Sequence, residues 1–290
     1  MAQVVIAGCG YVGNALATLL LEGGHEVYGV RRDVSKLAAG VHPIAGDLAD
    51  PKTLGPAPSR VEYVVYAVGA DDGSERAYRR AYLDGLAGLL EWLANEGQRP
   101  RRIVMTSSTS VYGQRRGEPI DEQSPTHPTQ FRGETLLASE RLLAASGLSS
   151  VVVRLGGIYG PDRTGLVERV RAGGLRRRPA PHYTNRIHRD DAAGLIAHLL
   201  FHPDPDPLYL GVDDEPAEEG ELYVWLAKEL GVEPPESVEE DEEETRGDDR
   251  RRSAGSKRCS NRRARESGYR FRYPTFREGY GALLRAMRSG

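Results

Sequence analysis

The stretch Gln3-Val4-Val5-Ile6-Ala7-Gly8-Cys9-Gly10-Tyr11-Val12-Gly13 decides the fold of this 290-residue chain. Its first five residues are mostly apolar and predict a buried strand, and the apolar spacing of Asn14–Leu21 predicts a helix directly afterwards. The glycines between them have separate tasks in such a turn. Gly8 makes the tight turn, Gly10 leaves room for a bound group to approach the backbone, and Gly13 lets the helix pack on the strand.

Strand and helix signals continue to alternate through the first 155 residues. Helical periodicity is expected at Glu75–Asn95 and Glu134–Ala145. Continuous apolar runs, which suit parallel strands buried on both faces, lie at Val27–Val30, Val61–Val68, Ile103–Met105 and Val151–Leu155. This order predicts an α/β protein with a Rossmann-type, doubly wound parallel sheet.

The pattern loosens after about residue 160, so we expect a nucleotide-binding domain over 1–160 and a smaller mixed region for substrate or partner binding over 161–290. Asp190–Phe201 and Glu221–Leu230 are expected to be helices within that region. Segment 233–256 is strongly charged, first acidic and then basic, which predicts a mobile loop.

The glycine turn predicts a dinucleotide site because it follows a strand and opens a helix. A helix N-terminus offers free N–H groups and a positive dipole end, which together favour a pyrophosphate. A glycine turn with no ligand is the alternative. The residues of this turn expected to contact the cofactor are Gly8, Gly10, Tyr11, Val12 and Gly13.

The end of the second strand indicates which cofactor is bound. Arg31 stands where an acidic residue would chelate the ribose hydroxyls of NAD, and Arg32 follows it as a second expected cofactor contact. A guanidinium can bind a 2′-phosphate with two hydrogen bonds, so NADP is favoured over NAD. In the alternative, Arg31 stacks on adenine and tolerates both cofactors, while Asp33 reaches the ribose.

Composition narrows the classes of partner. The net charge of −3 argues against nucleic acid and anionic membranes as partners, and no apolar run approaches the roughly 20 residues of a membrane span. Two cysteines and seven scattered histidines predict neither a disulfide framework nor a metal site. No export signal is visible at the start, so a cytoplasmic location is expected. The oligomeric state stays open, with a homodimer as one option.

Several segments resemble the extended short-chain dehydrogenase/reductase family, also called the NAD-dependent epimerase/dehydratase family. Ser107–Gly113 is similar to the family's SSxxVYG segment, Arg154–Pro161 to its RxxxIYGP segment, and Arg186–Asp191 to its IHxxD element. Lys257–Asn261 and Gly268–Tyr280 resemble the bacterial YeeZ-like subgroup. The resemblance implies further cofactor contacts at an adenine turn and at the turn after the fourth strand, namely Asp47, Leu48, Ala67, Val68 and Gly69.

The resemblance also implies a catalytic pair that this chain lacks. In the family a Tyr moves the substrate proton and a Lys four residues later lowers the pKa of that phenol. Aligning on Glu140 places Arg132 at the Tyr position and Leu136 at the Lys position, and no Tyr-x-x-x-Lys occurs anywhere in the sequence. Arginine stays protonated and cannot serve as a base. Ser108 matches the family's substrate-binding hydroxyl.

Other side chains remain candidates for chemistry. Tyr112 and Tyr159 carry phenols within family segments, although such tyrosines usually pack, and His188 is either a cleft residue or a hydrogen-bonded structural histidine. Arg132 binds an anion or lies on a solvated helix surface. Two functions therefore compete: an oxidoreductase or epimerase-like enzyme with a substituted proton relay, and a non-catalytic NAD(P)-binding redox sensor or regulatory module.

Overall fold

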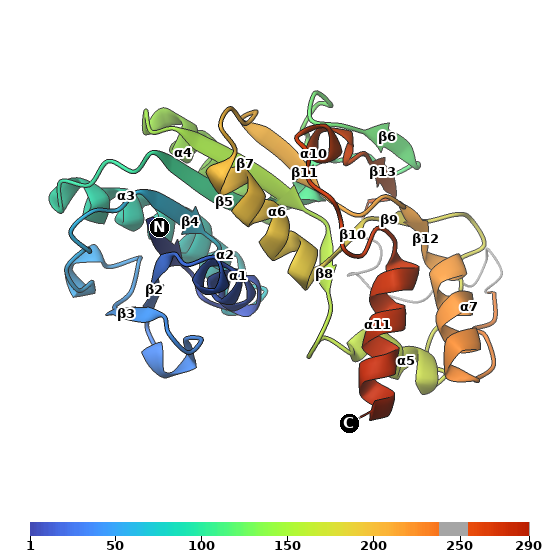
Figure 1. Ribbon diagram of the computed structural model, residues 1–290. Helices are drawn as coiled ribbons and strands as arrows, with labels where there is room; N and C mark the ends of the chain where they lie inside the picture. Colours follow the sequence, from blue (N-terminus) through green and yellow to red (C-terminus); the bar gives the residue numbers. More distant parts are fainter. Residues whose placement is uncertain (238–254, 290) are drawn as a thin grey trace. The chain divides into compact units, whose positions relative to one another are not determined.

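A seven-stranded sheet forms the centre of the computed structural model (Figure 1), which describes residues 1–237 and 255–289. The strand order is β11-β7-β5-β4-β1-β2-β3. The pairs β1–β2, β1–β4, β2–β3 and β4–β5 are parallel. The strands are β1 (Gln3–Ala7), β2 (Glu26–Arg31), β3 (His42–Ala45), β4 (Tyr63–Tyr66), β5 (Arg102–Ser108), β7 (Ser150–Leu155) and β11 (Leu208–Gly211). The predicted doubly wound parallel sheet is confirmed.

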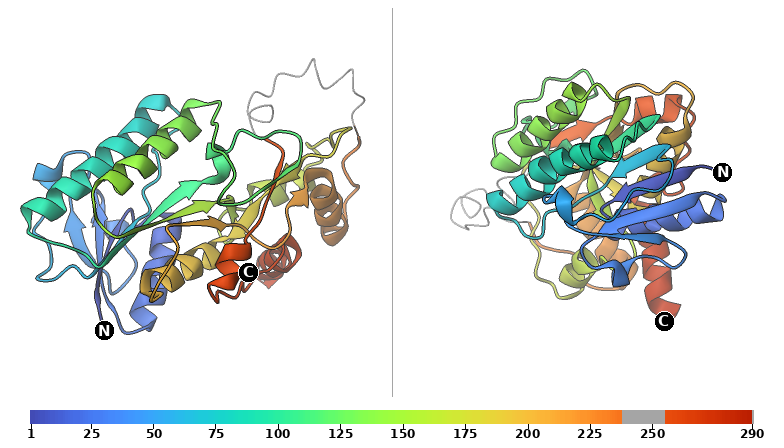
Figure 2. Two further views of the ribbon diagram at one scale, coloured as in Figure 1. Left: turned by 90° about the horizontal axis from the view of Figure 1, so that it is seen from above. Right: turned by 90° about the vertical axis from the view of Figure 1, so that its left-hand side faces the viewer.

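Helices cover both faces of this sheet (Figure 2). One face carries α1 (Tyr11–Glu22) and α6 (Arg189–Phe201), and the other carries α3 (Gly85–Asn95) and α4 (Phe131–Ala145). The apolar runs of the strands explain this arrangement, because residues buried on both faces need a helical layer on each side. Short 3₁₀ turns are η1 (Val34–Lys36), η2 (Pro51–Thr53) and η4 (Thr109–Val111).

The helix expected at Glu75–Asn95 is present but interrupted. It consists of α2 (Glu75–Arg79), a π-helical turn η3 (Arg80–Asp84) and α3. The main core packs this helix and α4 against the strands of the sheet. Its almost fully buried residues include Leu86, Leu89 and Trp92 of α3, Leu143 of α4, and the strand residues Val5, Val64, Tyr66, Ile103 and Met105.

The chain forms two compact units that alternate along the sequence. Unit 1 comprises residues 1–111, 128–154 and 192–209, and unit 2 comprises 112–127, 155–191 and 210–290. The single boundary at 160/161 that the sequence suggests remains a prediction about which parts act as domains.

Unit 2 has a separate core, and its strands within residues 112–237 and 255–289 are short. Its helices are α5 (Gly165–Arg171), α7 (Glu219–Leu230), α10 (Arg262–Glu266) and α11 (Phe276–Ser289). Its two-stranded pairs are β8 (Gly157–Tyr159) with β10 (Arg186–His188), β9 (Tyr183–Thr184) with β12 (Ala217–Glu218), and β6 (Glu118–Ile120) with β13 (Lys257–Cys259). Residues 238–254 of the charged segment expected to be a mobile loop lie outside the described residues.

Candidate functional site

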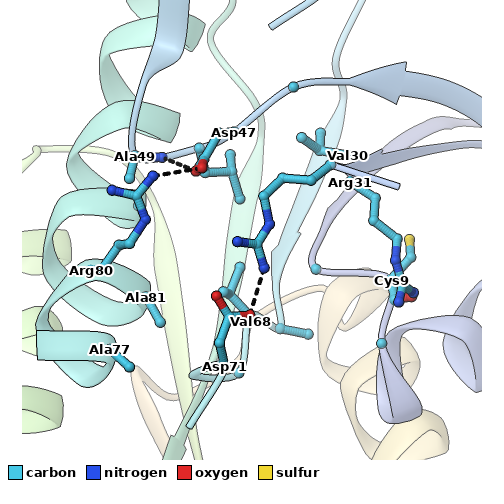
Figure 3. A pocket seen from close by; sticks show the side chains of 18 residues that line it. Cys9, Val30, Arg31, Asp47, Ala49, Val68, Asp71, Ala77, Arg80 and Ala81 are labelled. Carbon is cyan, nitrogen blue, oxygen red and sulfur yellow. Dashed lines mark hydrogen bonds and ion pairs between the residues drawn. The ribbon is translucent and has the colours of Figure 1, made fainter. Parts of the chain in front are cut away.

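A pocket in unit 1 opens beyond the carboxyl ends of β1, β2, β3 and β4 (Figure 3), the position where open α/β sheets bind ligands. Its volume is about 210 Å³. The predicted cofactor residues that line it are Gly8, Gly10, Arg31, Arg32, Asp47, Leu48, Ala67, Val68 and Gly69. Segments from four separate loops therefore meet where the sequence predicts the dinucleotide.

The glycine turn has the geometry that a pyrophosphate requires. Gly8 has a φ of +95°, and a Cβ there would come within 2.6 Å of the Val68 nitrogen. A Cβ on Gly13 would lie 2.3 Å from the Gly8 carbonyl oxygen, so only glycine lets α1 pack this closely. A Cβ on Gly10 would meet nothing within 4 Å, which leaves open space at the N-terminus of α1. The residues present thus fit the dinucleotide's phosphates.

Two neighbouring arginines line the pocket at the end of β2: Arg31 is the last residue of the strand and Arg32 follows it. The Arg31 guanidinium donates a hydrogen bond to the carbonyl of Cys9, in the glycine turn. Arg32 pairs with Asp71 at 2.5 Å, with more than half of each side chain exposed. An exposed pair of this kind is worth little and can be exchanged for a ligand anion at small cost. Both guanidinium groups therefore bring positive charge to the lining of the pocket.

A third arginine, Arg80 of η3, reaches the same pocket from the helix that covers it. Its Nη2 lies 2.6 Å from Asp47 Oδ2, while Asp47 Oδ1 accepts the Ala49 N–H at 3.0 Å. Burial opposes ionisation of Asp47, but the Ala49 hydrogen bond and the Arg80 guanidinium outweigh it and lower the pKa of this carboxyl. The turn predicted to contact adenine at Asp47 is thus joined to η3 by the ion pair with Arg80.

Some predicted contacts lie elsewhere. Tyr11, Val12 and Gly13 are in the first turn of α1 but do not line the pocket. Asp33, the alternative ribose ligand, is also absent from the lining, and its carboxylate accepts hydrogen bonds from Ser35 instead. Gly46, in the adenine turn that the resemblance implies, also lines the pocket. The lining residues not predicted from the sequence are Cys9, Val30, Ala49, Asp71, Ala77, Arg80, Ala81 and Gly85. Arg80 and its helical neighbours carry no local signal, since only the fold brings them to the glycine turn.

Arg132, at the start of α4, is held by three groups of unit 1. Its Nη2 donates to the Gly73 carbonyl at 3.2 Å, and its guanidinium carbon lies 5.6 Å from the Tyr78 ring centroid and 5.4 Å from that of Phe131. These cation–π contacts fix the guanidinium against aromatic rings. Arg132 is therefore hydrogen-bonded to the loop between β4 and α2, and it does not line the dinucleotide pocket.

The remaining family positions near α4 are structural. Leu136 is 4% exposed and offers no charge to any neighbour. Buried Glu140 accepts from Arg154 Nη2 at 2.6 Å and from Arg154 Nε at 3.1 Å, and Ser107 Oγ donates to it at 2.5 Å. This network ties α4 to β5 and β7, and breaking it would leave an uncompensated buried charge.

The predicted hydroxyl Ser108 ends β5, directly after that network. It is half-buried, and its Oγ accepts the Ser110 N–H at 3.1 Å. A serine hydroxyl that accepts one hydrogen bond still has its own proton to donate. Ser108 therefore keeps the capacity to bind an oxygen, and its role in catalysis stays a prediction.

The phenols and the histidine singled out in the sequence are engaged inside unit 2. Tyr112 is 2% exposed and donates to the Asp121 carbonyl at 3.1 Å. Tyr159 stacks on Tyr280 with ring centroids 4.4 Å apart, and burial raises the pKa of its phenol. His188 Nδ1 accepts the Asp190 N–H at 3.2 Å, as in a structural histidine.

The described residues were also compared with the requirements of a metal centre and of a membrane-spanning helix. Across the described ranges 1–237 and 255–289, no group of three His, Cys, Asp or Glu side chains is arranged to hold a metal ion. Within the same ranges no helix has both the length and the apolar character needed to cross a membrane.

Comparisons with known proteins agree with this geometry. Residues 4–204 match the NAD dependent epimerase/dehydratase family. A 3-diazoavenalumate denitrifying reductase from Streptomyces sp is 30% identical over 261 residues, covering 81% of this chain and 84% of that protein. Protein YeeZ of Escherichia coli K12 is 36% identical over 140 residues, which are 47% of this chain and 48% of YeeZ.

The solved structure of an NAD-dependent epimerase/dehydratase from Methylobacillus flagellatus shares the fold over 99% of both chains. Its TM-score is 0.80 and its identity 34%. The seven-stranded sheet, the glycine turn and these matches lead to one conclusion. The chain belongs to the NAD-dependent epimerase/dehydratase family.

Proposed function

We propose that this protein is an NAD(P)-dependent reductase that transfers hydride without a tyrosine–lysine proton relay. The observation that carries the proposal is the pocket of unit 1, where open backbone at Gly10 and the guanidinium groups of Arg31, Arg32 and Arg80 surround the predicted dinucleotide site. The bound cofactor would supply the hydride, and the protein would supply binding, orientation and charge.

NADP is the proposed cofactor. Arg31, Arg32 and Arg80 line the pocket together with two carboxylates, Asp47 and Asp71, so the side chains of the lining carry a net positive charge. Asp33, which could have chelated a free ribose hydroxyl, is occupied with Ser35. A positive lining without a free acidic residue favours a cofactor that carries an additional phosphate.

The absence of a proton relay restricts the substrates that can react efficiently. Reduction of a ketone needs a proton on oxygen as hydride reaches carbon, and neither Arg132 nor Leu136 can provide it at the family's usual position. A substrate in which a leaving group carries away the electron pair needs no such proton. In an arenediazonium ion, hydride adds to the ring carbon, the carbon–nitrogen bond breaks and N₂ departs, giving the arene and NADP⁺ with atoms and charge balanced.

The Streptomyces relative supports this substrate class, because its name describes a reductase that removes nitrogen from a diazo compound. The test is NADPH consumption by the purified protein with three acceptors: a substituted arenediazonium ion, a ketone and a nucleotide sugar. We expect protein-dependent N₂ release from the first, at a rate well above that of the ketone. Equal rates with ketone and diazonium would overturn the proposed restriction.

A non-catalytic NAD(P)-binding module is the second candidate. Arg132 is clasped by Gly73 and two aromatic rings, and Tyr112 is committed to the Asp121 carbonyl, so both side chains serve packing. This candidate predicts cofactor binding with no turnover of any acceptor. The same three assays separate it from the reductase, because a sensor leaves NADPH unconsumed in all of them.

A further inference from the structure

The helix that lines the dinucleotide pocket contains a π turn, η3, and a side chain from strand β4 is hydrogen-bonded to this turn. In a regular α-helix the Gly85 N–H would donate to the Ala81 carbonyl. Here it donates to the Arg80 carbonyl, five residues back. The Ala81 carbonyl instead accepts a hydrogen bond from the phenol of Tyr66 at the end of β4. Tyr66 thus takes the place of a backbone donor within the helix.

Gly85 provides the room for this substitution. A Cβ at Gly85 would lie 2.7 Å from the Tyr66 hydroxyl oxygen and 3.3 Å from the Arg80 carbonyl oxygen. Tyr66 itself is fully buried, so its hydroxyl must be hydrogen-bonded inside the protein. Burial raises the pKa of this phenol, which therefore stays protonated and remains a donor. The phenol therefore donates to the carbonyl that the π turn leaves without its helical N–H donor, in the space that a side chain at position 85 would fill.

The π turn forms one wall of the pocket. Ala77, Arg80, Ala81 and Gly85 all line it, although Tyr66 does not. An extra residue in one turn rotates the helix before it relative to the helix after it, and such turns are frequent at functional sites. In this chain the rotation presents Arg80 to the carboxylate of Asp47, 2.6 Å away, on the adenine side of the pocket (Figure 3).

We propose that Tyr66 is a positioning residue for dinucleotide binding: its phenol holds open the π turn that sets Arg80 against Asp47, and this pair binds the adenosine part of the cofactor. The inference rests on the proposed cofactor site and deepens it. Arg80 is the binding residue, and Tyr66 acts only through it.

A double-mutant cycle on cofactor affinity tests this relation. Tyr66→Phe removes the hydroxyl and keeps the ring, and Arg80→Met keeps the length and removes the charge. We expect each single variant to weaken NADPH binding about tenfold in calorimetric titration. In the Arg80→Met background, Tyr66→Phe should change the affinity by less than about twofold. Tyr63→Phe, on the same strand and away from the pocket, is the matched control and should bind as the wild type does.

A second cycle needs no cofactor. Gly85→Ala should lower Tm in the wild-type background, because its methyl group meets the phenol oxygen. The same change should cost less in the Tyr66→Phe background, where that oxygen is gone and a regular α-helical turn can form. A crystal structure of the Tyr66→Phe, Gly85→Ala double variant is expected to show the backbone N–H of position 85 donating to the Ala81 carbonyl.

The outcomes are distinguishable. A wild-type protein that binds neither NADPH nor NADH would overturn the proposed function and, with it, the role of Tyr66 in cofactor binding. Normal wild-type binding combined with additive effects of Tyr66→Phe and Arg80→Met would overturn this inference alone. Additive Tm losses for Tyr66→Phe and Gly85→Ala would likewise contradict the claim that the phenol holds the π turn open.

Discussion

The glycine turn between β1 and α1 and the start of α4 lie in the same unit and follow the family pattern to different degrees. The glycine turn has every feature that a dinucleotide needs. Helix α4 has the Gly133 that packs against Ser110 and the buried Glu140, but the chain contains no Tyr-x-x-x-Lys, and the resemblance implies that Arg132 and Leu136 stand at the positions of that pair. The sequence features that predict cofactor binding are thus present without those that predict proton transfer.

The difference has a physical reason. Binding of a dinucleotide relies on backbone shape, on a helix N-terminus and on charges spread over several loops. Proton transfer relies on one phenol and one ammonium group at i and i+4. Two substitutions can therefore remove the relay while the pocket and the helix stay intact.

The largest expected effect concerns the glycine turn. Gly10→Glu places bulk and a negative charge where the backbone must approach the pyrophosphate, and NADPH affinity should fall at least about 100-fold. Gly174→Glu, at an exposed glycine of unit 2 with equally open space, is the matched control. Both variants should keep the wild-type Tm within a few degrees. Tight NADPH binding by Gly10→Glu in calorimetry would remove the pyrophosphate assignment.

The start of α4 can be tested by restoring the relay. Arg132→Tyr combined with Leu136→Lys puts a phenol and an ammonium on one helix face beside Ser108, and ketone reduction should rise by about 10²–10⁴. Each single variant supplies only half of the relay and should gain little. Retained folding and NADPH binding are checked by circular dichroism and calorimetry, because Leu136 is buried. A parent enzyme that already reduces ketones as fast as the double variant would show that another residue carries the proton.

A smaller effect concerns the choice of cofactor. NADPH should bind more tightly than NADH by about 1–3 kcal/mol if Arg31 makes a charge-assisted bond to the 2′-phosphate. Arg31→Ala should erase this preference and leave NADH affinity unchanged. Arg32→Ala, measured alongside, shows how the preference is shared between the two neighbours. Equal wild-type affinities for NADPH and NADH would contradict the proposed preference.

The smallest expected effect is on the pH dependence of stability, and it tests whether His188 could supply the proton in place of the missing phenol. Burial lowers the pKa of His188 to about 4; neighbouring Asp190 opposes this shift, while Arg189 and Arg272 add to it. The folded protein therefore holds a neutral imidazole at pH 7, whereas the unfolded chain binds a proton below about pH 6.5. The resulting contribution to stability is full above about pH 6.5 and is lost as the pH falls toward 4.

His188→Asn should accordingly flatten the dependence of Tm on pH between about 6.5 and 4, as followed by thermal melts. The turnover rate of the wild-type protein and of His188→Asn should depend on pH in the same way between about 6.5 and 4. A rate that rises as the pH is lowered through 6.5, and that loses this rise in His188→Asn, would identify His188 as a proton donor.

The same contrast shows how far sequence alone could reach. The strands with continuous apolar runs were predicted, and so were the glycine turn and both ends of its loop. The apolar runs do not indicate β3 or β11, the two edge strands of the sheet, although the resemblance implies a strand before Gly46. In β3, for example, His42, Pro43 and Ala45 are exposed and Ile44 alone is buried.

Arg80 and the π turn could not be predicted for a different reason. The sequence of residues 75–95 is compatible with one regular helix, and the interruption depends on the phenol of Tyr66 in a strand that precedes it along the chain. Such an interaction between distant segments leaves no periodic signal. The hydrogen bond from Arg132 to the Gly73 carbonyl could not be predicted either, because it forms only when α4 packs beside α2.

The most direct test of the account follows deuterium from the transferring carbon of labelled NADPH into product, using an arenediazonium acceptor and mass spectrometry. If the protein transfers hydride from NADPH to the ring carbon, the arene will carry one deuterium, N₂ will be released, and the rate will fall to the uncatalysed background in Gly10→Glu. NADPH that binds tightly to the wild-type protein but transfers no deuterium above that background to diazonium, ketone or nucleotide sugar would contradict it.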